Sequence, residues 1–195
     1  MTPCIVVLAA GQGARFQAQA GAGQSKLLAP CPGLDGVERP VLAQTLRSLD
    51  GLPGERVLVT RPDRPEIAEL GRLHGFQVIL APSPGMGDSL AAAVAAAPLA
   101  AGWLVVLGDM PFIRPDTYRQ VSMAVHDQII CVPVAGQGYG HPVAFGSAFA
   151  AGLMGLNGDQ GARRLFAGAT VVEIAVADPG IYCDIDLPSD LLRRL

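Results

Sequence analysis

Six short apolar runs recur along the chain. They are rich in valine and isoleucine, which favours β-strands, and they occupy residues 4–10, 56–60, 76–81, 103–109, 129–134 and 171–176. Segments of helical character, many bounded by glycine or proline, lie between them at residues 40–49, 65–74, 89–97, 115–125 and 147–156. Apolar strands that alternate with helices predict an α/β fold with a mostly parallel sheet covered on both faces.

Two loops of this pattern lie where ligands are expected. In folds of this class, ligands bind beyond the carboxyl ends of the strands. The glycine-rich loop that begins at Gly11 follows the first strand, and "GDMP" (residues 108–111) follows the fourth. No repeat or linker divides the 195 residues, so we expect one domain over residues 1–195.

Composition narrows the class of ligand. The net charge is −3 and the isoelectric point is about 5.5, so the chain has no basic field for nucleic acid or anionic lipid. No apolar run approaches the roughly 18 residues of a membrane span, and the N-terminus lacks a basic segment. We therefore expect a cytoplasmic protein with no nucleic-acid or membrane partner and with a small, specific ligand.

The glycine-rich loop has the residues of a phosphate site. Gly11 and Gly13 lack Cβ atoms, so the backbone N–H groups around them can approach an anion closely. Arg15 and Lys26, the only lysine of the chain, would add positive charge. An ordinary turn is the alternative that these residues leave open.

Two familiar phosphate-binding loops are excluded by spacing. A dinucleotide fingerprint G-x-G-x-x-G requires glycine at position 16, where the chain has Phe16. A P-loop requires G-K-[ST], but Ser25 precedes Lys26 and Leu27 follows it.

Three carboxylates complete the candidate chemistry. Asp109 follows an apolar strand, and a carboxylate at a strand end suits Mg²⁺, although an Asx cap of the next turn is the alternative. Asp184 and Asp186, in "DIDLPSD", lie on one face of an extended segment, and one of them would complete the metal site. Asp190 is predicted in a terminal helix, whereas Asp178, His74 and His126 are expected on the solvated surface.

The motifs of the chain, taken in order, resemble the molybdenum cofactor nucleotidyltransferase family, which attaches a nucleotide to molybdopterin. The motifs are "LAAGQGARF" followed by Lys26, then "GMGDSL", "LGDMPFI", "GHPVAFG", "GDQGAR" and "DIDLPSD". They cover almost the whole chain and are most similar to those of the molybdenum cofactor cytidylyltransferases. The resemblance implies a Rossmann-like, three-layer α/β/α fold of the nucleotide-diphospho-sugar-transferase type.

The resemblance also implies roles for individual residues. CTP or GTP would be the nucleotide, and Ala10 in "LAAG" favours CTP, because guanylyltransferases more often have "LAGG". Mg²⁺ would be bound by Asp109 with Asp186. Arg15, Lys26 and Asp109 would be catalytic, and the nucleotide would be bound by Leu8, Ala9, Ala10, Gly11, Gly13, Arg15, Lys26, Ser89 and Asp109.

The acceptor, molybdopterin or the molybdenum cofactor, would be bound by His141, Asp184 and Arg163. Without the resemblance, other roles stay open for two of these residues. A lone histidine such as His141 is as often a structural hydrogen-bonding group, and an arginine on a helix, such as Arg163, is often simply exposed. Ser89 and Asp88 are equally suited to cap a helix.

One departure from the family pattern concerns Lys26. The family usually has its lysine a few residues after the Arg-Phe pair, whereas "QAQAGAGQS" separates Phe16 from Lys26 here. Loops accept such insertions at small entropic cost, about 0.6 kcal/mol per doubling of length. Whether Lys26 reaches the phosphates across this insertion is a question for the structure.

Three other functions remain open from the sequence. They are a guanylyltransferase that uses GTP on molybdopterin, a cytidylyltransferase for another phosphorylated acceptor, and a non-catalytic molybdopterin-binding chaperone. A molybdenum hydroxylase would be the client of such a protein.

Overall fold

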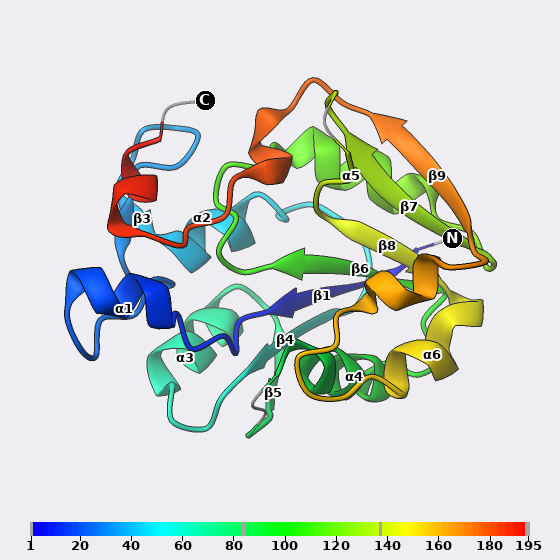
Figure 1. The fold of residues 1–195 in the computed structure, drawn as a ribbon, viewed down its shortest axis with the longest axis horizontal. Helices are drawn as coiled ribbons and strands as arrows, with labels where there is room; N and C mark the ends of the chain where they lie inside the picture. Colours follow the sequence, from blue (N-terminus) through cyan, green and yellow to red (C-terminus); the bar gives the residue numbers. More distant parts are fainter. Residues whose placement is uncertain (1, 83–84, 137, 194–195) are drawn as a thin grey trace.

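The computed structural model describes residues 2–82, 85–136 and 138–193. Within them, seven strands form one sheet in the order β5-β4-β1-β6-β8-β7-β9 (Figure 1). Only β8 runs against the others among these strands, because it pairs antiparallel with both β6 and β7. The strands are β1 (Cys4–Leu8), β4 (Arg56–Thr60), β5 (Gln77–Leu80), β6 (Gly102–Leu107), β7 (Ile129–Val134), β8 (Val143–Gly146) and β9 (Thr170–Ala175).

Helices cover both faces of this sheet, as the sequence predicts. One face packs against α2 (Val41–Arg47), α3 (Pro65–Leu73) and α5 (Pro115–Ala124), and the other against α4 (Met86–Ala96) and α6 (Ala150–Met154). Alternate residues of β1 serve the two cores: Ile5 and Val7 face the first, and Val6 faces the second. The expected three-layer α/β/α fold is therefore present (Figure 1).

The six predicted strands are confirmed, and several elements were not predicted, among them a short strand and a helix in the glycine-rich loop. The strand β8 lies inside the "GHPVAFG" motif and is only four residues long. The helix α1 (Ala14–Ala20) lies within the glycine-rich loop, where alanine and glutamine favour a helix between flanking glycines. Phe16 is its buried anchor, with 3% of its surface exposed.

Short 3-10 helices and a two-stranded hairpin complete the fold. The predicted helix at residues 147–156 is split between a 3-10 turn and α6. The 3-10 helices are η1 (Ser147–Phe149), η2 (Ala162–Phe166), η3 (Pro179–Tyr182) and η4 (Pro188–Leu192), and the hairpin pairs β2 (Pro30–Cys31) with β3 (Arg39–Pro40).

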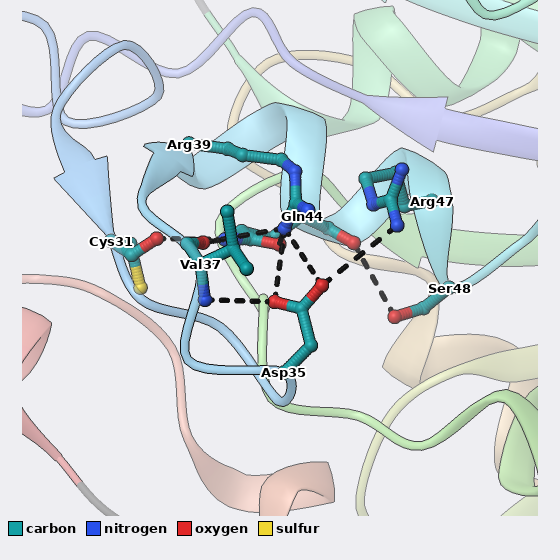
Figure 2. Close-up of polar contacts among 7 residues, drawn as sticks. All are labelled: Cys31, Asp35, Val37, Arg39, Gln44, Arg47 and Ser48. Atoms are coloured by element: carbon teal, nitrogen blue, oxygen red, sulfur yellow. Dashed lines mark hydrogen bonds and ion pairs between the residues drawn. The ribbon is translucent and has the colours of Figure 1, made fainter.

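A buried glutamine holds the hairpin loop in place (Figure 2). The Gln44 Nε2 donates to the carbonyl oxygens of Cys31 at 2.7 Å and Val37 at 2.6 Å. Its Oε1 accepts from Arg39, which also pairs with Asp35. The loop folds closely around this side chain because its backbone polar groups are satisfied from within.

One surface prediction is wrong. Asp178 is buried, with 2% of its surface exposed, because its carboxylate accepts hydrogen bonds from three groups. These are the backbone N–H of Arg114, the hydroxyl of Thr117 and the backbone N–H of Gly180. A buried carboxylate is stable when it is saturated with donors, which sequence spacing alone does not reveal.

Candidate active site

A cavity of about 570 Å³ opens at the carboxyl ends of β1 and β6. The chain runs from β1 to β4 and β5 on one side, and then crosses to β6 on the other, so the crevice lies where the strand order reverses. Its lining is Leu8, Ala9, Ala10, Gly11, Gln12, Gly13, Lys26, Leu27, Gly85, Met86, Ser89, Leu107, Asp109, Asp159, Asp184 and Asp186.

The glycine loop forms one wall of this cavity. Gly13 has a φ of 65°, a left-handed conformation that favours glycine, and it begins α1. Gly11 is different, because a Cβ built on it would meet nothing within 4 Å. The fold therefore leaves open space at Gly11, which itself lines the cavity.

Lys26 lies at the base of the same loop. A Cβ on Gly13 would be 3.5 Å from its Cγ, so the aliphatic stem of Lys26 passes directly against the glycine. Its Nζ lies 2.6 Å from Asp109 Oδ2 and 3.2 Å from Asp186 Oδ1. The inserted residues thus fold as α1 and the turn after it, and they return Lys26 to the cavity.

Arg15 extends this ion-pair cluster to the surface. Its Nη1 lies 2.8 Å from Asp186 Oδ2, and its side chain is 80% exposed, against 12% for Lys26. Arg15 does not line the cavity, although it contacts a carboxylate that does. The structure therefore brings Arg15, Lys26, Asp109 and Asp186 together at one end of the cleft.

The cluster shifts the pKa values of two of its members. Burial tends to lower the pKa of Lys26, but the carboxylates of Asp109 and Asp186 outweigh it and raise this pKa above its usual value. Burial tends to raise the pKa of Asp186, and the Lys26 and Arg15 cations outweigh that effect and lower it. Both groups are consequently charged at neutral pH.

The C-terminal segment fixes the position of Asp186. The N–H of Ile185 donates to the Asp109 backbone carbonyl at 2.9 Å, which ties this segment to the end of β6. Asp190, in η4 as the sequence predicts, accepts from the N–H groups of Asp186 and Leu187. Asp184 also lines the cavity, so both carboxylates of "DIDLPSD" reach it.

The start of α4 forms the opposite wall with the loop at residues 157–160. The Gly87 N–H donates to the Gly158 carbonyl at 2.8 Å, and a Cβ on Gly85 would be 2.0 Å from that same oxygen. Asp88 and Ser89, for which the sequence left a capping role open, are not the N-cap residue, because α4 begins at Met86 with Gly85 as its N-cap. Ser89 is buried in the first turn, where its hydroxyl donates to the Gly85 carbonyl.

Several residues of the cavity were not predicted as site residues. Gln12 lies between the two loop glycines, and Asp159 lies within "GDQGAR". The motif "GDQGAR" was recognised, but nothing in it showed that Asp159 lies in the cavity. Asp159 lies there because the backbone of this motif packs closely against the glycines of "GMGDSL", which is distant in the sequence.

A second cavity of about 460 Å³ adjoins the first and shares Leu8, Met86 and Leu107 with it. His141 and Arg163 line this second cavity, whereas Asp184 lines the first. The three residues expected to bind the acceptor are thus divided between two adjacent cavities. The second is largely apolar and includes Tyr139 and Phe166, whose rings stack with centroids 5.8 Å apart.

His141 has an unsatisfied nitrogen in this environment. Its Nδ1 is buried and has no hydrogen-bond partner among the described residues. Burial lowers the pKa of His141 below its usual value of 6.5, although Asp109 and Asp184 act in the opposite direction. The imidazole is therefore neutral at neutral pH.

Asp109 and Asp186 fit a divalent cation whose remaining ligands come from a bound substrate and water. Within the described part of the chain there is no group of three or more metal-binding side chains. Asp109 and Asp186 are close enough to contact the same Lys26 ammonium, and Mg²⁺ is often bound by one or two carboxylates together with substrate phosphates. The pair matches that donor set.

Comparison with known proteins gives the family. The model of the MobA-like NTP transferase domain matches residues 5–174, which is most of the chain. The chain belongs to this family. The glycine loop, Lys26 and Asp109 lie inside the matched region, whereas Asp184 and Asp186 lie beyond it.

A curated relative and three solved structures extend the comparison. The bifunctional protein GlmU of Leifsonia xyli is 33% identical over 152 residues, or 71% of this chain and 29% of the relative. Rv0371c of Mycobacterium tuberculosis is 29% identical with a TM-score of 0.80 (97% of this chain, 95% of that one). A manganese complex of Rv0371c is 27% identical with a TM-score of 0.77, over 97% of this chain and 96% of that one.

Molybdopterin-guanine dinucleotide biosynthesis protein A of Archaeoglobus fulgidus shares the fold, with a TM-score of 0.65 and 18% identity over 96% of this chain and 94% of that one. The chain spans less than a third of the length of the curated relatives it matches. In the described residues, every helix is too short or too polar to cross a membrane.

Proposed function

We propose that residues 1–195 form one nucleotidyltransferase unit that transfers CMP from CTP to molybdopterin or the molybdenum cofactor and releases pyrophosphate. The observation that carries the proposal is the cluster of Lys26, Asp109 and Asp186 beside the glycine loop. Family membership supports a nucleoside triphosphate as one substrate. The motif resemblance and the A. fulgidus neighbour support molybdopterin as the other.

In this proposal the triphosphate lies along the glycine loop, with its base toward the start of α4. Gly11 leaves room for a phosphate group, and Lys26 and Arg15 supply charge from below and from the rim. Leu8, Ala9, Ala10 and Ser89 form the walls on the nucleotide side. The acceptor enters from the second cavity, past His141 and Arg163, toward Asp184, which lines the first cavity together with Asp109 and Asp186.

The reaction is an in-line displacement at the α-phosphorus. A terminal phosphate oxygen of the acceptor forms the new bond to this phosphorus, and the bond to the β-phosphate bridging oxygen breaks, so that pyrophosphate departs with the electron pair. A phosphate nucleophile is already ionised at neutral pH, so no general base is needed. Lys26 and Arg15 stabilise the charge that grows on the leaving pyrophosphate.

A divalent cation, Mg²⁺ in this proposal, would be held by Asp109 and Asp186 and would neutralise phosphate charge. The donor set of two carboxylates supports this assignment, as does the manganese complex of Rv0371c. His141 is neutral and so suits hydrogen bonding to the acceptor better than proton transfer.

A nucleotide panel tests the choice of CTP. Binding to the native state raises the midpoint of thermal unfolding, so unfolding is followed with CTP, GTP or ATP in the presence of Mg²⁺. CTP is expected to give the largest shift. A larger shift with GTP would assign the chain to guanylyl transfer, and binding of molybdopterin without any nucleotide effect would favour the chaperone function.

A further inference from the structure

The Lys26 ammonium occupies the position between two carboxylates that a divalent cation would need. Asp109 Oδ2 and Asp186 Oδ1 both contact Nζ, at 2.6 and 3.2 Å. The second Asp186 oxygen is in contact with Arg15. Because Mg²⁺ requires oxygen ligands at about 2.0–2.1 Å, the cation and the ammonium compete for the same oxygens.

The charges of this cluster balance without a metal. Two carboxylates face one ammonium and one guanidinium, so the four side chains together carry no net charge. Lys26 and Asp109 are mostly withdrawn from water, with 12% and 20% of their side chains exposed, so salt screens their pairing only partly. In this state a free divalent cation therefore competes for Asp109 and Asp186 with two cationic side chains, although Asp159 and Asp184 also line the cavity.

A triphosphate offers Lys26 a second anionic partner. The stem of Lys26 already lies against Gly13, at the base of the loop that lines the cleft. Rotation about the flexible terminal bonds of the side chain takes Nζ from the carboxylates toward that loop. Arg15, on the exposed rim, can leave Asp186 in the same way.

We propose that Lys26 sets the order of binding at this site. The ammonium holds Asp109 and Asp186 until a triphosphate binds, then transfers to the phosphates and releases both carboxylates to the divalent cation. The inference rests on the proposed function only in that the cleft binds a triphosphate, and not on the identity of the base or of the acceptor.

Mn²⁺ binding to the ligand-free protein tests the first half of this exchange. Free Mn²⁺ is measured by electron paramagnetic resonance with the wild-type chain, Lys26→Met and Lys26→Arg. Lys26→Met should bind Mn²⁺ at least about tenfold more tightly than the wild type, because no ammonium then competes for the two carboxylates. Lys26→Arg keeps the charge and should match the wild type.

Arg72→Met is the control, since it breaks an exposed ion pair with Glu69 outside the cleft. It should leave Mn²⁺ affinity unchanged. Lys26→Met with affinity equal to or below that of the wild type would overturn the proposal.

Tripolyphosphate binding tests the second half without Lys26→Met, and so remains decisive if that variant does not fold. Calorimetry in EDTA should detect tripolyphosphate binding that Lys26→Arg retains. Binding that requires Mn²⁺ would overturn the order proposed. Neither probe contains a base or molybdopterin, so a failure of the proposed transfer reaction would leave both results unchanged and would be recognised separately.

Discussion

Lys26 Nζ lies 2.6 Å from Asp109 Oδ2, although the two residues come from distant parts of the chain. They meet because α1 and the turn after it fold the inserted residues back against the glycine loop. The only lysine of the chain therefore reaches the end of β6, where the strand order places a ligand site. This contact joins the motif "LAAGQGARF" with its lysine to the motif "LGDMPFI".

Asp109→Asn is expected to reduce kcat/KM for pyrophosphate release by about 10²–10³, the range found when a group that stabilises transition-state charge is removed. The side chain keeps its shape but loses the charge that faces Lys26 and that, in the proposed function, would hold the divalent cation. Steady-state pyrophosphate release, with thermal unfolding as a check of folding, measures the effect.

Asp63→Asn is the matched control, because it removes a carboxylate from an exposed pair with Arg61. It should retain wild-type turnover. Equal turnover of Asp109→Asn and Asp63→Asn would exclude Asp109 from the chemistry.

Gly11→Ala is expected to weaken nucleotide binding about tenfold, or by about 1.4 kcal/mol, without changing stability. The added methyl group meets no protein atom within 4 Å, so the fold accepts it, but in the proposed function it takes space that a phosphate group needs. Calorimetric titration with CTP measures affinity, and denaturant unfolding measures stability.

Gly13→Ala provides the contrast at the same loop. Its φ of 65° strains an alanine, so the free energy of unfolding should fall by about 1–2 kcal/mol. A stable Gly11→Ala protein with unchanged CTP affinity would show that the loop does not approach the phosphates.

Gln44→Leu is expected to lower the free energy of unfolding by about 2 kcal/mol, since it leaves the Cys31 and Val37 carbonyl oxygens without their donor (Figure 2). Urea unfolding measures this loss. Gln120→Leu, at an exposed position of α5, should change stability by no more than about 0.5 kcal/mol. Equal stabilities of the two variants would mean that Gln44 does not hold the hairpin loop.

His141 is expected to make stability depend on pH below its usual pKa of 6.5. Burial lowers its pKa in the folded state, so between the two pKa values the unfolded chain binds more protons. The free energy of unfolding therefore falls as pH drops below 6.5. His74, whose pKa is also lowered by burial, acts in the same direction.

His141→Phe isolates one contribution, because His74 is present in both proteins. Urea unfolding at about pH 5.5 and 7.5 should show a smaller loss of stability in the variant than in the wild type. A loss of the same size in both would show that His141 is not buried in its neutral form.

Periodicity predicted the sheet well, because apolar strands buried on both faces are recorded directly in the sequence. The strand β8 was missed because two of its four residues are alanine and glycine, which do not favour strands. Asp178 was misplaced because its burial depends on donors from Arg114, Thr117 and Gly180, which tertiary structure supplies.

In the site, too, some features could be predicted from the sequence and others depend on tertiary structure. Motifs identified Lys26, Asp109 and Asp186, and strand order explains why the first two meet. The reach of Lys26 could not be predicted, because it depends on whether the inserted residues form a helix. The division of His141 and Asp184 between two cavities likewise depends on the path of the C-terminal segment.

The most direct test of the central claim is transfer of a nucleotide to molybdopterin by the wild-type chain. The protein is incubated with molybdopterin, Mg²⁺ and CTP or GTP. The dinucleotide product is identified and quantified by mass spectrometry, and the released pyrophosphate is quantified in the same reaction. We predict a cytosine dinucleotide and pyrophosphate in equal amounts, with CTP favoured over GTP by about tenfold or more in kcat/KM. Absence of product and pyrophosphate with either nucleotide would contradict the account.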